Sequence, residues 1–191
     1  MAEASDGTRV LRRIDDTFSA AERIEMKALG ILDDEGHILR LPTAPVQVAR
    51  KSITSLDALN EAYCYGLPSS FTRGLSVSIE AGQRILWISG TASIDDGGET
   101  VHLGDFRAQT WRTYWNITRL LASEGATWHD IVRTTCYLRD IERDYDEFNK
   151  VRTLFFECLG LDPLPASTGI QARLCRSDLL IEIESFAVVK A

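Results

Sequence analysis

Hydrophobic and polar residues alternate regularly only from about Phe71 onward. The run FTRGLSVSIEAGQRILWISGTASI holds two segments rich in β-branched and aromatic residues, joined by EAGQ, which predicts a β-hairpin. In GDFRAQTWRTYWNITRLLASEG, apolar and small residues recur at helical spacing, with Asp105 as N-cap and Gly125 at the end. IVRTTCYLRD has the composition of a strand, and DYDEFNKVRTLFFECLG predicts a second amphipathic helix.

The last segment, TGIQARLCRSDLLIEIESFAVV, predicts two more strands, separated near RSD. The order β-β-α-β-α-β-β is typical of an α+β two-layer sandwich with two helices on one face of the sheet. Since side chains alternate along a strand, Ile181, Ile183 and Ala187 are expected to face the helices. Glu182 and Glu184 then lie on the other face, for which the chain offers no cover. We therefore expect a homo-oligomer whose subunits cover each other's sheets.

The first part of the chain lacks such a pattern. SAAERIEMKALG predicts a short helix with Ser19 as N-cap and Gly30 at its end. ILDDEGHILRLPTAP predicts a hairpin or turn, and SITSLDALNEAY a second small helix. These segments have too few apolar repeats for a core of their own. We therefore expect an N-terminal extension, 1–65, and one folded domain, 66–191, which suits a chain of 191 residues.

Composition and charge exclude several classes of function. The formal net charge is −7, and the chain lacks the basic stripe that binds phosphates, so no nucleic-acid partner is expected. No stretch approaches the roughly 18 consecutive apolar residues of a membrane span, and no leader-like apolar segment occurs near the start, so a cytoplasmic protein is expected. The four cysteines and three histidines show no ligand spacing. Neither a metal nor a cofactor is expected.

The segments ISGTASI, FNKVRTLFFE and PASTGIQARLCRSDLLIEIESFAVV, with the run GDFRAQTWRTYWNITRLLASEGATWHDIVRTTCYLRD, resemble the Rid superfamily, also called YjgF/UK114. The resemblance covers about residues 71–190. It implies a chorismate-mutase-like fold and a homotrimer with pockets between adjacent subunits. Well-known members hydrolyse reactive enamines and imines, and their motif places a carboxylate-binding arginine fifteen residues before the first glutamate of EIE. In this chain that position is Ser167.

SGTASI together with CRSDLLIEIE is also similar to the C-terminal half of the chorismatases, Rid-related enzymes that hydrolyse chorismate and release pyruvate. The resemblance implies that Glu182 is the acid of the reaction, and some chorismatases have cysteine at the position of Cys175. Both reactions protonate a carbon of an electron-rich C=C bond. A carboxyl group in apolar surroundings keeps its proton nearer neutral pH. Glu182 is therefore the expected general acid, with a structural interface carboxylate as the alternative, and Glu184 is expected to be structural.

The remaining candidates bind substrate. Arg152 follows Asn149 by one helical turn and is a candidate for the carboxylate, and Arg73 is a second cation. Gly90 would let a ligand approach the backbone closely. Ordinary structural roles are the alternatives: a surface charge for either arginine and a small apolar filler for the cysteine. The candidate substrate-binding residues are Arg73, Gly90, Thr91, Ser93, Arg152, Ser167 and Cys175.

The sequence thus predicts a trimeric Rid-superfamily enzyme with a chorismatase-like site that hydrolyses a small anionic enol ether or enamine. The first alternative is an enamine or imine deaminase in which Arg152 or Arg73 binds the substrate carboxylate. The second is a non-catalytic trimer that binds a metabolite or a protein partner and regulates it.

Overall fold

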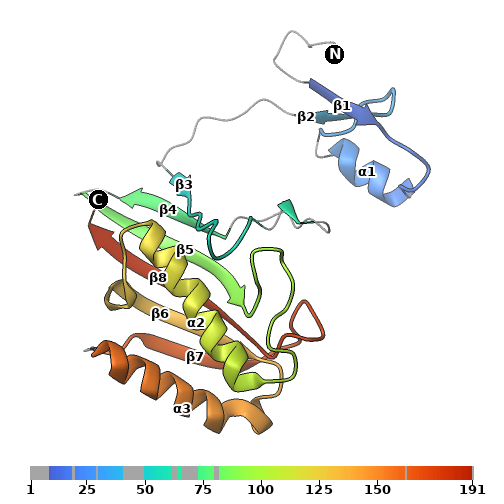
Figure 1. Ribbon diagram of the computed structural model, residues 1–191. Helices are drawn as coiled ribbons and strands as arrows, with labels where there is room; N and C mark the ends of the chain where they lie inside the picture. The colour runs from blue at the N-terminus through green and yellow to red at the C-terminus, as the bar shows by residue number, and fades with distance from the viewer. Residues whose placement is uncertain are drawn as a thin grey trace. The chain divides into compact units, whose positions relative to one another are not determined.

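The chain divides into two compact units, Met1–Gln47 and Val48–Ala191, in the computed structural model (Figure 1). The second unit therefore begins before the expected boundary at residue 66. The residues that the structure describes are 9–18, 20–28, 30–40, 50–61, 64–65, 73–79, 82–161 and 163–190.

The first unit contains a two-stranded antiparallel sheet and one helix. Strand β1 (Arg9–Arg13) pairs with β2 (His37–Arg40), and α1 (Ala20–Ala28) lies between them in sequence. Gly30 ends the helix at φ 70, where its N–H donates to the Lys27 carbonyl, as predicted. The predicted N-cap, residue 19, lies outside the described residues. The expected hairpin or turn is a turn followed by β2, whose partner β1 the sequence pattern did not predict.

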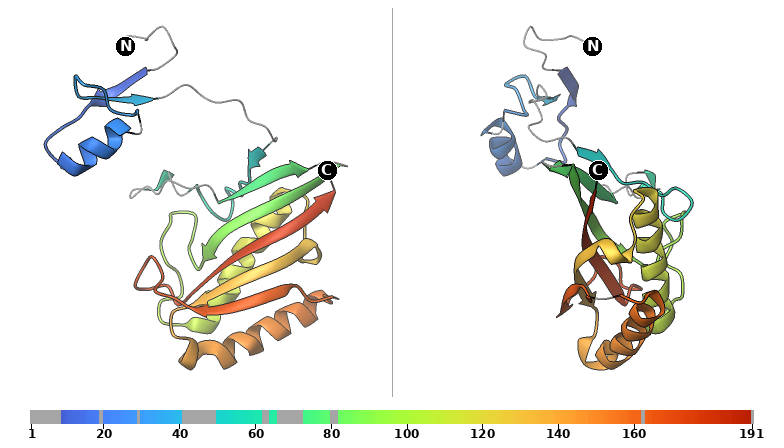
Figure 2. Two further views of the ribbon diagram at one scale, coloured as in Figure 1. Left: turned by 180° about the vertical axis from the view of Figure 1, so that it is seen from behind. Right: turned by 90° about the vertical axis from the view of Figure 1, so that its left-hand side faces the viewer.

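The second unit is a six-stranded sheet with two helices on one face (Figure 2). Its elements are β3 (Arg50–Ser52), β4 (Gly74–Ile79), β5 (Gln83–Ala92), α2 (Phe106–Ser123), the 3₁₀ turn η2 (Trp128–Asp130), β6 (Ile131–Leu138), α3 (Ile141–Leu159), β7 (Ala166–Gln171) and β8 (Ile181–Lys190). The strand order is β3-β4-β5-β8-β6-β7, antiparallel except for the parallel pair β6–β7. The predicted two-layer α+β sandwich is confirmed, as is the order of the elements from β4 to β8, but the edge strand β3 was not predicted.

Capping residues set the helix starts. The Asp105 side chain accepts a hydrogen bond from the Ala108 N–H, as its predicted role as N-cap of α2 requires. Helix α3 begins three residues earlier than predicted. The Asp140 carboxylate accepts from the Arg143 N–H and so satisfies a free donor of the first turn. The long α3 then provides the crossover that the parallel strands β6 and β7 need.

The helix expected in SITSLDALNEAY is absent from its described part, and that prediction is wrong. The segment starts in β3 and continues into a turn, where the Ser55 carbonyl accepts hydrogen bonds from the N–H groups of Ala58 and Leu59. Ile53, Ala58 and Leu59 are fully buried in the core of the second unit. Tertiary burial of these apolar residues outweighs the weak helical propensity of the segment.

Alternation along β8 is as predicted. Ile181, Ile183 and Ala187 are fully buried under the helices, whereas Glu182 is half-buried on the opposite face. We call this opposite side of the sheet the open face. It carries apolar side chains as well, among them Trp87, which is 45% exposed and packs on Phe186 with 4.6 Å between ring centroids. A homotrimer that covers this face remains a prediction.

Candidate functional site

Two carboxyl groups occupy the centre of the open face. Glu182 pairs across the sheet with Ala92 of β5 and Tyr137 of β6, while Glu184 pairs with Thr135 of β6. Burial, and secondarily the negative charge of Glu184, raises the pKa of Glu182 above its ordinary value. A carboxyl group in this setting holds its proton at a higher pH than a solvated glutamate, so Glu182 can act as a proton donor.

Gly90 makes room for the Glu182 carboxyl group. A Cβ atom at position 90 would overlap the Glu182 carboxylate oxygen. Gly90 lies where the register between β5 and β8 shifts, between Ile88 and Thr91. The sequence predicted that Gly90 would admit a ligand, and what approaches its backbone in this structure is the side chain of Glu182.

The hydroxyl groups of Thr91 and Ser93 bond within the chain. Thr91 Oγ1 donates to the Ser89 carbonyl at 2.9 Å, and Ser93 Oγ donates to the Val101 carbonyl at 2.9 Å. Both residues are buried. The bond from Ser93 holds the loop after β5 to the end of that strand, so these hydroxyls shape the region around Gly90.

Arg73 is buried and engaged with the segment that precedes β4. Its Nε donates to the Asn60 carbonyl at 2.9 Å, and its Nη2 donates to the Tyr65 hydroxyl at 2.7 Å. The guanidinium also lies 5.2 Å from the centroid of the Tyr65 ring. These contacts hold Asn60 and Tyr65 to the start of β4, and because Arg73 is buried, the alternative of a surface charge does not describe it.

Cys175 is exposed, in the loop between β7 and β8. The alternative of a buried apolar filler therefore does not describe it in a single chain. The neighbouring Arg176 donates to the Gly98 carbonyl and so ties this loop to the loop after β5. The cysteine stands beside that tie between the two loops.

Arg152 reaches the position where the resemblance led us to expect an arginine. Its Nη1 donates to Ser167 Oγ at 3.2 Å, and its Nη2 donates to Asn149 Oδ1 at 2.5 Å. The two residues border a pocket of about 500 Å³ between α3, β7 and the connection that joins them. The carboxylate-binding role predicted for Arg152 thus has a cavity next to it. We call this cavity the α3–β7 pocket.

The sheet separates this pocket from Glu182 within one chain. Ser167 pairs with Thr134, and their hydroxyls are 2.9 Å apart on the helix-covered face. Glu182 pairs with Tyr137, on the open face. Neighbouring residues of a strand point to opposite sides, so Thr134 and Tyr137 mark the two faces of β6. Glu182 and Arg152 can therefore meet in one site only if different copies of the chain supply them.

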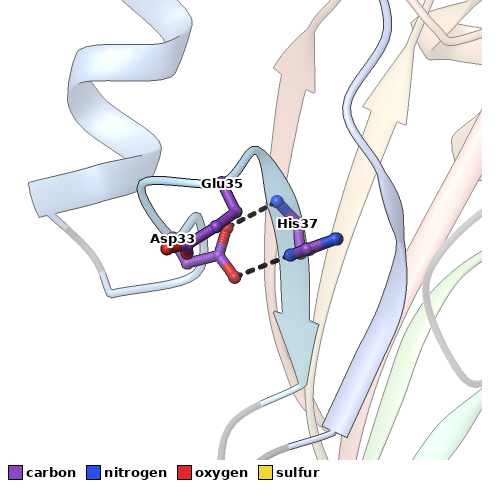
Figure 3. A group of neighbouring side chains, drawn as sticks. All are labelled: Asp33, Glu35 and His37. Atoms are coloured by element: carbon purple, nitrogen blue, oxygen red, sulfur yellow. Dashed lines mark hydrogen bonds and ion pairs between the residues drawn. The ribbon is translucent and has the colours of Figure 1, made fainter. Parts of the chain in front are cut away.

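The first unit holds a group of potential metal ligands that the sequence pattern did not single out. One ligand atom each of Asp33, Glu35 and His37 lies within 4.8 Å of the others (Figure 3). Asp33 accepts from the His37 N–H at 2.6 Å and contacts His37 Nδ1 at 2.9 Å, and these bonds lower the pKa of Asp33. Both Asp33 oxygens are thus engaged in holding the turn before β2.

None of the described helices is both long and apolar enough to serve as a membrane span.

The family model described as Endoribonuclease L-PSP matches residues 72–189. The 3-aminoacrylate deaminase RutC of Acinetobacter baylyi is 33% identical over 105 residues, which are 55% of this chain and 79% of the relative. A RutC family protein of Pyrococcus abyssi is 30% identical over 112 residues, 59% of this chain and 84% of the relative.

Solved structures agree with the fold. The Rid family protein YyfA of Yersinia pestis, described as of unknown function, has a TM-score of 0.60 at 26% identity, over 74% of this chain and 100% of its own. The YjgF gene product of E. coli has a TM-score of 0.59 at 24% identity, over 73% of this chain and 99% of its own. The family match spans more than half of the chain, and the two solved structures share the fold over 73–74% of it. The chain therefore belongs to the Endoribonuclease L-PSP family, which is the YjgF/Rid family.

Proposed function

We propose that this protein hydrolyses a small anionic enamine and releases ammonia, with Glu182 as the general acid. The observation that carries the proposal is the half-buried Glu182 carboxyl group, whose pKa is raised by burial and by Glu184. The relative named 3-aminoacrylate deaminase, at 33% identity, supports an enamine as the substrate. This choice places the deaminase ahead of the chorismatase-like reaction that the sequence favoured.

The proposed reaction needs one proton donor and one water. Glu182 donates its proton to the electron-rich carbon of the C=C bond, and the nitrogen lone pair forms the C=N bond of an iminium ion. Water then adds to the iminium carbon, the C–N bond breaks, and ammonia leaves while a carbonyl group forms. The water supplies the proton that restores Glu182. Enamine and water thus give a carbonyl compound and ammonia.

The site is composed of two copies in this proposal. The open face of one copy supplies Glu182, and the α3–β7 pocket of the next supplies Arg152 for the substrate carboxylate. Glu182 and the α3–β7 pocket lie on opposite faces of the sheet. The exposed Trp87 makes the open face a suitable surface for a neighbouring copy. A ring of three copies repeats the same junction three times, in keeping with the predicted homotrimer.

Complementation between two inactive variants tests the composite site. Chains with Glu182→Gln and chains with Arg152→Met are co-produced with different affinity tags, and mixed trimers are purified through both tags. Each mixed trimer has one junction with both residues intact, so we expect about a third of the wild-type activity. Pure trimers of either variant serve as controls. If the mixed trimers are as inactive as the pure ones, Glu182 and Arg152 of different copies do not form one active site, and the composite site is refuted.

Turnover assays decide the reaction. Turnover of 2-aminoacrylate and of 3-aminoacrylate is measured as loss of the enamine. Turnover of chorismate is measured as release of pyruvate. We expect the enamines to react. Hydrolysis of a chorismatase-type enol ether is the second candidate, favoured by a pocket of about 500 Å³, which is large for a three-carbon acid. Activity on chorismate alone would replace the first proposal, and activity on none of them would favour the non-catalytic regulator.

A further inference from the structure

The α3–β7 pocket combines apolar walls with a small polar end. Tyr145, Phe156, Leu161 and Leu164 supply apolar surface, and Arg152 with Ser167 supplies hydrogen-bond donors. We infer that the pocket binds a monocarboxylate with a ring-sized apolar body, held at its charged end by Arg152 and Ser167. This inference rests on the proposed function for the identity of the site, and it names the class of substrate.

Ser167 has a proton to offer a ligand. A hydroxyl group has two acceptor lone pairs and one donor hydrogen. Thr134 Oγ1 donates to Ser167 Oγ at 2.9 Å, and Arg152 Nη1 donates to it at 3.2 Å, so both lone pairs are in use. The remaining hydrogen of the exposed Ser167 is available to a carboxylate oxygen beside the guanidinium. The buried Cys136 sulfur, 3.8 Å from Ser167 Oγ, is a weak competitor for it.

The hydrogen bonds from Cys136 to Thr134 and from Thr134 to Ser167 have the same donor-to-acceptor direction. Burial raises the pKa of the Cys136 thiol, which therefore stays protonated and donates to Thr134 Oγ1 at 3.9 Å. Thr134 then donates to Ser167. This sequence of donors leaves Ser167 as the group that donates into the pocket.

Arg152 is held in place before any ligand binds. Asn149 Oδ1 accepts from its Nη2, and the Phe148 ring lies 4.9 Å below the guanidinium carbon. A guanidinium has five N–H donors, and these contacts use only a part of them. A preorganised cation next to a hydroxyl donor is suited to a carboxylate, because little side-chain entropy is lost on binding.

Size and charge define the rest of the ligand. A pocket of about 500 Å³ lies in the range that drug-sized ligands occupy, so an apolar ring fits where a three-carbon acid leaves space unfilled. A neighbouring hollow shares Tyr145 and Gly169 with the pocket and is lined by Glu142 and Asp146. These acidic side chains disfavour a second carboxylate at that side. The pocket thus selects one negative charge at the Arg152 end.

Binding of unreactive acids tests the inference independently of turnover. Propionate, 3-phenylpropionate, 3-phenylpropanol and 4-carboxyphenylpropionate are titrated into the wild-type protein, and their dissociation constants are measured by calorimetry. We expect 3-phenylpropionate to bind about tenfold or more tightly than each of the other three, since tenfold corresponds to about 1.4 kcal/mol. Propionate or the dicarboxylate binding as tightly as 3-phenylpropionate would overturn the inference.

Variants assign the binding to the pocket. Arg152→Met should abolish the preference for the acid over the alcohol, and Ser167→Ala should weaken acid binding by about threefold to tenfold. Lys150→Met is the matched control, because it removes the same charge from the same helix and lines no wall of the pocket. Equal effects of Arg152→Met and Lys150→Met would refute the site.

The outcomes separate this inference from the proposed function. Arg152-dependent binding of 3-phenylpropionate by a protein that hydrolyses no enamine would support the pocket and refute the enamine reaction. Enamine turnover without a size preference among the acids would support the enamine reaction and refute the inferred ligand of the pocket.

Discussion

At the residue scale, the charge of Glu184 bears directly on the proton held by Glu182. The pKa of Glu182 is raised by burial and by this neighbouring carboxylate. The protonated form is the donor, so activity should fall as pH rises through this pKa, at a higher pH than an ordinary glutamate would give. In Glu184→Gln one cause of the elevation is removed, and the falling limb of kcat/KM should move to lower pH. An unmoved limb would show that another group titrates.

Replacing Glu182 by Gln keeps the size of the side chain but removes its transferable proton. We expect turnover to fall by about 10²- to 10⁴-fold, with little change in the thermal unfolding midpoint. Steady-state kinetics and circular dichroism measure the two quantities. Glu184→Gln is the matched control, since it removes a carboxylate two residues away on the same face. Full activity of Glu182→Gln would make Glu182 a structural residue.

The contact between Gly90 and Glu182 gives a second test at this scale. In Gly90→Ala the new methyl group collides with the flexible end of the Glu182 side chain, which must move. Activity should drop by at least about tenfold while stability changes little, because a flexible side chain can yield. Kinetics and thermal unfolding are compared for Gly90→Ala and for Gly97→Ala, a control in the following turn. Unchanged activity of Gly90→Ala would mean that the position of the carboxyl group is unimportant.

At the element scale, α2 and α3 pack through aromatic rings. Tyr114 of α2 stacks on Phe155 of α3 with ring centroids 4.5 Å apart. The Tyr114 hydroxyl is buried and finds no hydrogen-bond partner among the residues that the structure describes. Tyr114→Phe removes this hydroxyl and keeps the ring. We expect the free energy of unfolding to rise by about 1 kcal/mol, measured by urea denaturation. A loss of stability would reveal a partner such as a buried water.

At the scale of the whole molecule, the division of the chain decides which truncation folds. Deleting residues 1–47 removes the first unit and should leave the second folded. Deleting 1–60 also removes Ile53 and Leu59, which are fully buried in the core of the second unit, and should lower the unfolding midpoint strongly or prevent folding. Thermal unfolding followed by circular dichroism distinguishes the two. Equal unfolding midpoints of the two truncated chains would show that residues 48–60 do not stabilise the second unit.

The open face predicts the oligomeric state. Light scattering should give three times the chain mass of 21.3 kDa. Trp87→Asp places a charge on the exposed part of the face and should yield a folded monomer with no activity, because the composite site is lost. Leu103→Asp is a control at an exposed apolar residue ahead of α2 and should remain a trimer. A monomeric wild-type chain would remove the composite site.

Local patterns in the sequence determined most of the second unit. The alternation of β8 placed Ile183 under the helices and Glu182 on the open face, because side-chain direction repeats every two residues whatever the strand pairs with. The N-cap of α2 could also be predicted from the sequence, because Asp105 accepts a hydrogen bond from a backbone N–H group only three residues away. Glu182 as the candidate acid followed from this alternation and from the family resemblance.

Only the tertiary structure decided which distant residues meet. The pairing of β1 with β2, the packing of Ile53 in the core and the room that Gly90 gives to Glu182 all join residues far apart in sequence. The same holds for the separation of Arg152 from Glu182 by the sheet, which follows from how β7 pairs with β6. Such contacts depend on strand order and register. These are set by the burial of the whole apolar surface at once, and no short stretch of sequence encodes them.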